Sequence, residues 1–111
     1  MQNLGQNILF LDNEPEHQAK AKRLWPACTV VSTVDECIEQ FGNRSWTTLM
    51  VGDESSGDLG RWLGVNRVGL SEVILHGQPS PVQMILYLDL KKLGYYTHLA
   101  PFGSGSLWKS K

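Results

Sequence analysis

One short stretch decides the fold of this chain: ILFLDNEPE, at residues 8–16. Its first four residues are an uninterrupted apolar run, a pattern typical of a strand that is buried on both faces of a sheet. A polar turn follows at once, and Pro15 is a favoured first residue of a helix. The stretch therefore predicts a central parallel strand over residues 7–11, followed by a helix that Asp12 or Asn13 caps.

The remaining sequence repeats this alternation of strand and helix. Four further strands are predicted from β-branched or apolar runs, over residues 28–34, 46–51, 71–76 and 95–100. Three helices are predicted, over about residues 15–25, 33–42 and 80–94. The second and third helices begin with capping boxes, Thr33-x-x-Glu36 and Ser80-x-x-Gln83. The apolar stripe of the third helix is expected to be core: Val82, Ile85, Leu86, Leu90 and Leu93.

This order of elements predicts a three-layer α/β fold. Its sheet would have five mainly parallel strands in the flavodoxin-like order 2-1-3-4-5, with right-handed crossovers. A single domain is expected over residues 1–103, with a flexible tail over 104–111 from which Trp108 can dock. The glycine-rich segment SSGDLGRWLG, at 55–64, is expected to hold at most one helical turn, around Leu59 to Leu63.

Composition limits the classes of partner. The chain carries ten basic and eleven acidic residues, a net charge of −1, so no overall field favours duplex DNA or anionic lipid. Apolar runs are too short for a membrane helix, and the first residues, MQNLGQN, lack the basic and apolar regions of a signal peptide, so none is expected. Cys28 and Cys37 are expected to be reduced, buried thiols rather than a disulfide or a metal pair. A cytoplasmic location is therefore the expectation.

Polar residues follow three of the predicted strands, and the carboxyl ends of parallel strands meet at one edge of the sheet. They are Asp12, Asn13, Glu14, Asp53, Glu54 and His76. Clustered carboxylates repel one another unless a cation intervenes, and their hard oxygen ligands favour Mg²⁺ or Mn²⁺. The candidate metal ligands are Asp12 and Asp53, with Glu14 or Glu54. The alternative is that the first turn only caps a helix and that the second carries solvated charges.

His76 follows an apolar strand and precedes Gly77, where the buried strand opens into the expected cleft. A histidine there can act as a general acid or base, whereas the alternative is a buried ring hydrogen-bonded to backbone. Gln78, Ser80 and Asn13 are candidates for binding a substrate, aided by the free N–H groups at the start of the helix after Ser80.

The other rings receive structural assignments. His17 and His98 are expected at the surface or in structural contacts. Trp25 and Trp46 are expected in the core. Trp62 lies beside Arg61 and near Arg67, so it could line a nucleotide pocket by stacking, or pack in the core or in a lid.

The order of elements resembles that of response-regulator receiver domains over most of the chain. The resemblance rests on the acidic turn after the first strand, Asp53 after the third, and Pro101-Phe102 after the fifth. Receivers place a second acid at the position of Asn13, and a lysine at that of Ala100. An ordinary phosphorelay switch is therefore not expected.

A divergent branch, the cyclic-phosphate-processing receiver-like family, is more similar. Four segments fall in the matching order and spacing: LDNEP (11–15), VGDESSG (51–57), ILHGQPSPVQM (74–84) and LGYYTHLAPF (93–102). Gly52 or Asp53 would occupy the position of that family's first third-strand aspartate, and Gln78 that of its asparagine. The resemblance implies a metal-dependent phosphoesterase that processes cyclic phosphates at RNA ends or on nucleotides, with Asp53 and His76 as catalytic residues.

Two other hypotheses stay open. The first is a degenerate, non-catalytic receiver that binds a protein partner or a small phosphorylated ligand; Asn13, Gly52 and Ala100 favour it because each removes a charged group. The second is a structural or regulatory protein of a phage or mobile element, which no residue of the sequence tests.

Overall fold

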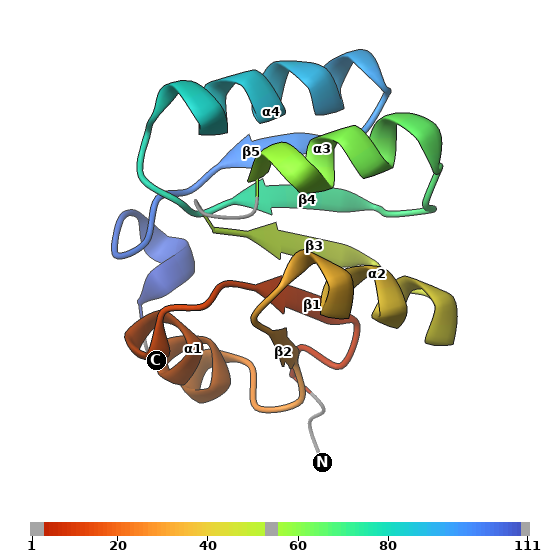
Figure 1. The fold of residues 1–111 in the computed structure, drawn as a ribbon. Coiled ribbons are helices and arrows are strands. Elements are labelled where there is room, and N and C mark those ends of the chain that lie inside the picture. The colour runs from red at the N-terminus through yellow and green to blue at the C-terminus, as the bar shows by residue number, and fades with distance from the viewer. Residues whose placement is uncertain (1–3, 53–55, 110–111) are drawn as a thin grey trace.

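The computed structural model describes residues 4–52 and 56–109, and its elements alternate along the chain. They are β1 Ile8–Leu11, α1 Pro15–Leu24, β2 Thr29–Val31, α2 Val34–Asn43, β3 Thr48–Val51, α3 Ser56–Val65, β4 Glu72–Leu75, α4 Pro81–Lys92, β5 Thr97–Leu99 and a 3₁₀ helix, η1, Ser106–Trp108. The five strands form one sheet of order β2-β1-β3-β4-β5, and every neighbouring pair is parallel (Figure 1). The predicted flavodoxin-like α/β fold is confirmed.

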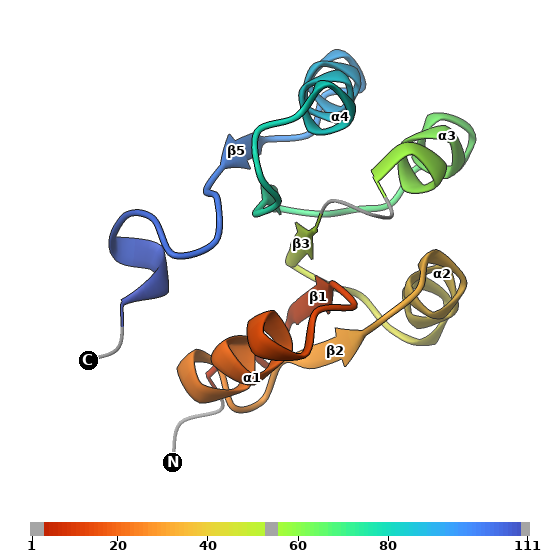
Figure 2. The same ribbon diagram turned by 60° about the vertical axis from the view of Figure 1, so that its left-hand side comes forward.

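The sheet is covered on both faces. Helices α2, α3 and α4 lie on one face, and α1 and the C-terminal segment lie on the other (Figure 2). Because side chains alternate along a strand, Leu9 and Leu11 of β1 join the core under the three helices, whereas Phe10 joins the core under α1. In β3 and β4 the residues facing α1 are Met50 and Ile74. The continuous apolar runs of the sequence therefore supply two cores.

The helix starts follow the predictions in part. Thr33 and Glu36 form the expected capping box of α2, and the Ser80 hydroxyl accepts a hydrogen bond from the Gln83 amide at the start of α4. The prediction that Asp12 or Asn13 caps α1 is wrong. Glu14 is the N-cap residue, without a side-chain cap, and the Asp12 carboxylate accepts from the Glu14 amide and contacts two histidines instead of capping the first turn.

Helix α3 is longer than the glycine-rich sequence indicated. We expected at most one turn around residues 59–63, and the structure has ten residues in helical conformation. Glycines disfavour a helix interior by up to about 1 kcal/mol each, but Leu59 and Leu63 are buried against the sheet and α4. A Cβ on Gly60 would lie 3.0 Å from Leu86 Cδ1, so the small residue permits the close approach of α3 and α4. Tertiary packing thus outweighs local propensity.

Helix α4 buries a narrower stripe than expected. Leu86 and Leu90 are buried, and Leu93 is partly buried against the same core, as predicted. Val82 and Ile85 are exposed, and their assignment to the core is wrong. The helix packs beside α3 near the β5 edge of the sheet, and the stripe that it buries is Gln83, Leu86 and Leu90, with Leu93 partly buried after its last turn.

The C-terminal segment is part of the core as far as Trp108. Its indole is 2% exposed, contacts the ring of Phe10 edge-on and donates from Nε1 to the Ala100 carbonyl at 3.0 Å. Gly103 and Gly105 take positive φ values, 85° and 67°, in the turns that bring the segment back onto the sheet. Trp108 therefore docks on the sheet, as the sequence analysis allowed.

Trp108→Ala should lower the free energy of unfolding by about 3–5 kcal/mol, because it removes a large buried side chain and leaves a cavity. Urea unfolding followed by circular dichroism measures the change. The control is Val65→Ala at an exposed position, which should stay within about 0.5 kcal/mol of wild type. Equal stability of the Trp108 variant and wild type would contradict this packing.

Both cysteine thiols are free and buried, as expected. Burial raises the pKa of the Cys28 thiol and raises that of Cys37 to about 12, so neither is a reactive thiolate near neutral pH.

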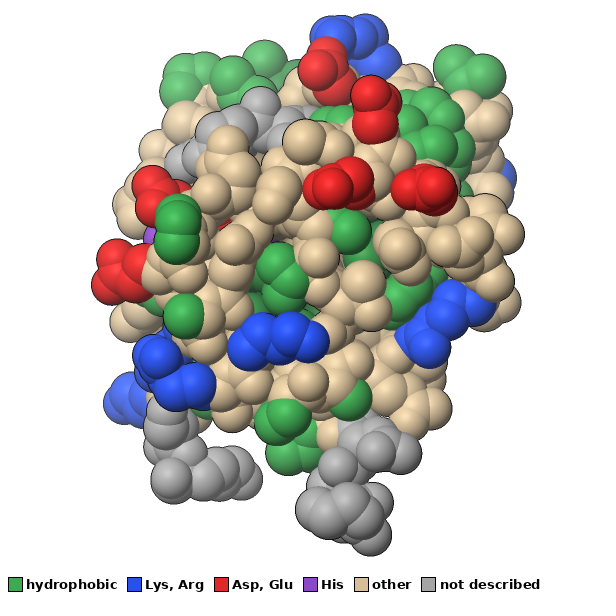
Figure 3. All heavy atoms as spheres, turned by 60° about the horizontal axis from the view of Figure 1, so that its bottom comes forward, with side chains coloured by type: hydrophobic (Ala, Val, Ile, Leu, Met, Phe, Trp, Pro, Cys, Tyr) green, Lys and Arg blue, Asp and Glu red, His purple; other side chains and the backbone are tan. Residues whose placement is uncertain are grey.

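The surface drawn in Figure 3 is mixed in charge, as the net charge of −1 indicates. Acidic and basic side chains both occupy the face drawn in Figure 3, so that face does not present a field of one sign. Among the described residues, no helix is long and apolar enough to cross a membrane.

Candidate functional site

The alternation that builds the core also builds a polar row at the carboxyl ends of the strands. Phe10 and Ile74 face α1. Because side chains alternate, the residue two positions after each of them points to the same side of the sheet. At these positions the chain has a polar side chain, or a glycine, in place of an apolar one. These next positions are Asp12, Gly52 and His76. Their backbone amides continue the sheet, with hydrogen bonds to Val31, Leu11 and Val51 respectively. The register of three strands thus places Asp12 and His76 together.

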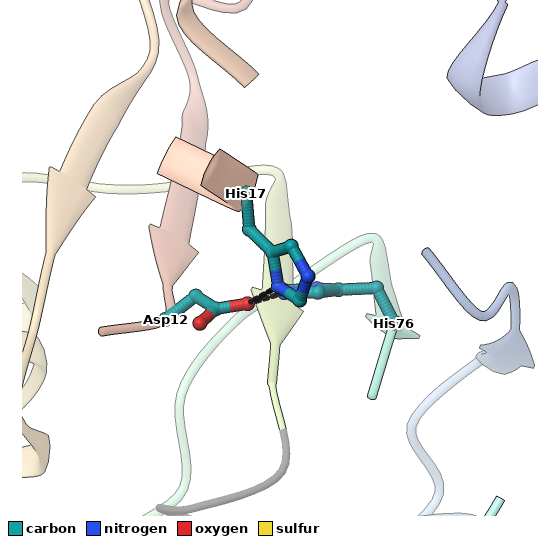
Figure 4. Close-up of side chains that lie close together, drawn as sticks. All are labelled: Asp12, His17 and His76. Carbon is teal, nitrogen blue, oxygen red and sulfur yellow. Dashed lines mark hydrogen bonds and ion pairs between the residues drawn. The ribbon is translucent and has the colours of Figure 1, made fainter. Parts of the chain in front are cut away.

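The Asp12 carboxylate joins two imidazole rings. Its Oδ2 lies 2.7 Å from His17 Nδ1 and 2.7 Å from His76 Nε2 (Figure 4). Its Oδ1 accepts a hydrogen bond from the Glu14 backbone amide at 2.8 Å. An ionised carboxylate only accepts hydrogen bonds, so both rings present an N–H to the same oxygen. We call these residues, Asp12, His17 and His76, the Asp–His–His cluster.

His17 reaches the cluster from the first turn of α1. Side chains of a helix tilt toward its N-terminus, so a residue near the start of α1 points back over the end of β1. Its ring stacks on Phe102, with centroids 3.9 Å apart and an interplanar angle of 26°. The sequence reasoning gave His17 only a structural or surface role and missed this position. The tilt of the first helical turn toward Asp12 was the signal that could have found it.

His76 is enclosed more completely. The residue is 0% exposed, and its ring stacks on Phe10 with centroids 4.5 Å apart and 10° between the planes. Trp108 contacts the same ring edge-on at 5.6 Å, and the His76 carbonyl accepts from the Phe102 amide at 2.9 Å. The C-terminal segment therefore forms one wall of the site.

Gly52 makes room for Asp12. A Cβ at this position would lie 2.8 Å from Asp12 Oδ2 and 2.9 Å from Asp12 Cγ, closer than real contacts allow. The sequence reasoning treated Gly52 as a missing acid. In this structure any side chain there would displace the carboxylate that holds both histidines.

Gly52→Ala should lower the free energy of unfolding by about 1–3 kcal/mol, because the added methyl overpacks against the Asp12 carboxylate. Gly42→Ala is the matched control: a Cβ there meets nothing within 4 Å, and alanine favours the helix, so stability should rise by about 0.5–1 kcal/mol. Denaturant titration measures both. Similar effects of the two substitutions would contradict the close approach of Gly52 to Asp12.

Asp12 is buried, and burial by itself would raise the pKa of its carboxyl. Hydrogen bonds from His76, the Glu14 amide and His17, together with the charge of His76, outweigh burial and lower the pKa below the ordinary value of 3.8. The carboxylate is therefore ionised throughout the neutral range.

This lowered pKa predicts acid sensitivity. A carboxyl whose pKa is lower in the folded than in the unfolded state stabilises the fold above its unfolded pKa, and this contribution is lost as pH falls through the folded pKa. The free energy of unfolding of the wild type should therefore fall between about pH 5 and pH 2. In Asp12→Asn the fall should be shallower, which urea unfolding at a series of pH values measures. If the free energy of unfolding fell equally with pH in the wild type and in Asp12→Asn, the lowered pKa of Asp12 would be contradicted.

The donor set of the cluster suits particular metals. One carboxylate oxygen and two imidazole nitrogens lie within 4.8 Å of one another, and all three side chains come from described residues. Imidazole ligands suit Zn²⁺ or Fe²⁺ better than Mg²⁺, which prefers oxygen. A cation here would replace the protons that the two rings direct at Asp12. The donor set therefore fits a transition metal. It holds two nitrogen ligands and one oxygen ligand, whereas the sequence predicted a site made of carboxylates.

The remaining predicted site residues lie around this cluster or outside the described chain. Asp53 and Glu54, predicted as metal ligands, fall outside the described residues. Glu14 is exposed at the start of α1 and contributes its backbone amide, not its carboxylate, to Asp12. Asn13 and Gln78 are exposed, whereas Ser80 is engaged in capping α4. His98 contacts Glu72 at the surface, in agreement with its assignment.

Comparisons with protein-family models, with curated proteins and with solved structures gave no match for this chain.

Proposed function

We propose that this chain is a receiver-like domain that binds a divalent transition metal through Asp12, His17 and His76 and hydrolyses cyclic phosphates. The observation that carries the proposal is a single carboxylate oxygen 2.7 Å from the ring nitrogens of two histidines at the carboxyl edge of a parallel sheet. Ligands of open α/β sheets bind at this edge, near the point where the strand order reverses. The order β2-β1-β3 puts that point beside Asp12.

The substrate class comes from the resemblance to the cyclic-phosphate-processing receiver-like family. The segments that carry it include LDNEP, which holds Asp12, and ILHGQPSPVQM, which holds His76. Phosphates at RNA ends or on nucleotides are the proposed substrates, and the two buried, unbridged thiols suit a cytoplasmic location.

The three residues of the cluster differ in exposure, and we assign their roles accordingly. His76 is fully buried, so its proposed role moves from general acid or base to holding the cation. The His17 side chain is 24% exposed, so it is the ligand of the three that a substrate would reach most readily. Asp12 would orient both rings. When bound, the metal would polarise a phosphoryl oxygen and lower the pKa of an attacking water.

A degenerate receiver that binds a protein or a small phosphorylated ligand without turnover is the second candidate. The burial of the cluster favours it, since Asp12 is 3% exposed and His76 0%. Asn13 and Ala100 also lack the charged groups that receiver chemistry uses.

Metal binding is the first test. Titration of the metal-free protein with Zn²⁺, and separately with Mn²⁺, should show one saturable site by calorimetry. Asp12→Asn, His17→Ala and His76→Ala should each weaken the affinity by about 10-fold or more, because each removes one of three ligands. His98→Ala is the matched control, because this histidine is half-buried at the surface and lies outside the cluster. A wild type that binds neither metal, or equal losses in the control, would remove the metal from the proposal.

Turnover is the second test. The metal-loaded protein is incubated with 2′,3′-cyclic nucleotides, and the opened monophosphate is detected by ³¹P NMR. We expect hydrolysis that a chelator abolishes and that Asp12→Asn lowers by about 100-fold or more. Metal binding without hydrolysis of any cyclic nucleotide would reject the enzyme and leave the non-catalytic module.

A further inference from the structure

A second candidate site lies at the opposite edge of the sheet from the Asp–His–His cluster. A cavity of about 570 Å³ opens between the ends of α2 and α3 and the loops that lead into β3 and β4. In Figure 1 the strand arrowheads point away from these loops, so the cavity is at the amino ends of the strands. Its volume lies within the range of small-ligand sites, about 300–1,000 Å³.

The charged groups of this cavity all have one sign. Arg44 and Arg67 line it, and its described lining includes no carboxylate. Within residues 4–52 and 56–109, neither arginine forms an ion pair, whereas Arg61 on the outer surface is paired with Asp58. The C-terminal ends of α2 and α3 bring roughly half a negative charge each, so two guanidinium groups leave about one net positive charge.

Both guanidinium groups are held by stacking. Arg44 lies over the ring of Trp46 at 4.1 Å, and Arg67 lies over Tyr95 at 4.6 Å. Arg44 also donates to the Gln6 carbonyl, and Arg67 donates to the Leu93 carbonyl. A guanidinium has five N–H donors in a planar fork, so both arginines keep donors for the oxygens of a phosphate.

The same cavity presents an aromatic wall. Trp62 lines it and stacks on Phe41, with centroids 5.6 Å apart and an interplanar angle of 10°. The sequence had indicated Trp62 near Arg67 as a stacking residue for a nucleotide, and the fold brings these two residues to one cavity with Arg44. Asn43 and Asn66 add amide groups beside the aromatic wall.

We propose that this cavity binds a nucleoside phosphate. The base would stack at the Trp62–Phe41 wall, and the phosphate would accept hydrogen bonds from Arg44 and Arg67. Stacking with cationic groups alongside is the chemistry by which proteins hold nucleotides without reading a duplex. The site is independent of the Asp–His–His cluster, because the two lie at opposite ends of the strands.

The test is calorimetric titration of the full chain with 5′-AMP, with amide chemical shifts to locate the site. We expect shifts at Trp62 and in the loops before β3 and β4. Arg44→Ala and Arg67→Ala should each weaken AMP binding by about 10-fold or more, since each removes charge-assisted hydrogen bonds. Arg44→Lys and Arg67→Lys keep the positive charge but remove the planar fork of N–H donors. Both variants should bind AMP more weakly than wild type, while their circular dichroism spectra stay those of the wild type.

Two controls separate this site from general attraction and from the cluster. Arg61→Ala removes an arginine outside the cavity, and Asp12→Asn disables the proposed metal site; both should leave AMP affinity unchanged. Absence of saturable AMP binding, shifts confined to the cluster, or equal weakening by Arg61→Ala would overturn the proposal. Inorganic phosphate binding as tightly as AMP would overturn the assignment of a nucleoside ligand.

The source of the nucleoside phosphate is resolved by a second titration with a short single-stranded RNA bearing a 5′-phosphate. Tighter binding of AMP assigns a free nucleotide, and tighter binding of the RNA assigns a strand end. Either order supports the site, provided that Arg44→Ala and Arg67→Ala weaken both ligands.

Discussion

A carboxylate buried at the end of β1, an interior strand of the sheet, is the constraint on which this structure depends. Asp12 is ionised and nearly inaccessible to solvent, and an unpaired charge in such a position would be strongly destabilising. His17 and His76 supply two donors, and the Glu14 amide supplies a third. The start of α1, the end of β4 and the glycine at 52 are all arranged so that this one carboxylate is satisfied.

The same constraint accounts for how the α1 face of the sheet is covered. Three helices cover the other face, but beside α1 the described chain places a turn and a single 3₁₀ helix after β5. Phe102 stacks on His17 and Trp108 packs against His76, so two aromatic rings exclude water from the cluster. Excluding water strengthens each hydrogen bond to Asp12, since the local dielectric constant is lower. The C-terminal segment therefore contributes to the electrostatics of the site as well as to the core.

The two ends of the strands, the carboxyl edge and the amino edge of the sheet, present opposite charges to a ligand. The carboxyl edge has one buried carboxylate between two imidazole rings, a donor set suited to a cation. The amino edge has two guanidinium groups and an aromatic wall, an arrangement suited to an anion with a flat ring. Such a division is compatible with a net charge near zero, because the charges are separated in space rather than unequal in number.

The sequence by itself determined the element order and the position of Asp12 and His76. Apolar runs fix which segments are buried strands, and parallel strands end at one edge. Only the tertiary structure decided the rest. The strand register set the 2.7 Å contacts; the tilt of the first turn of α1 brought in His17; and packing against Leu86 made a helix of a glycine-rich segment. These outcomes depend on contacts between residues distant in sequence, which local propensity and periodicity do not encode.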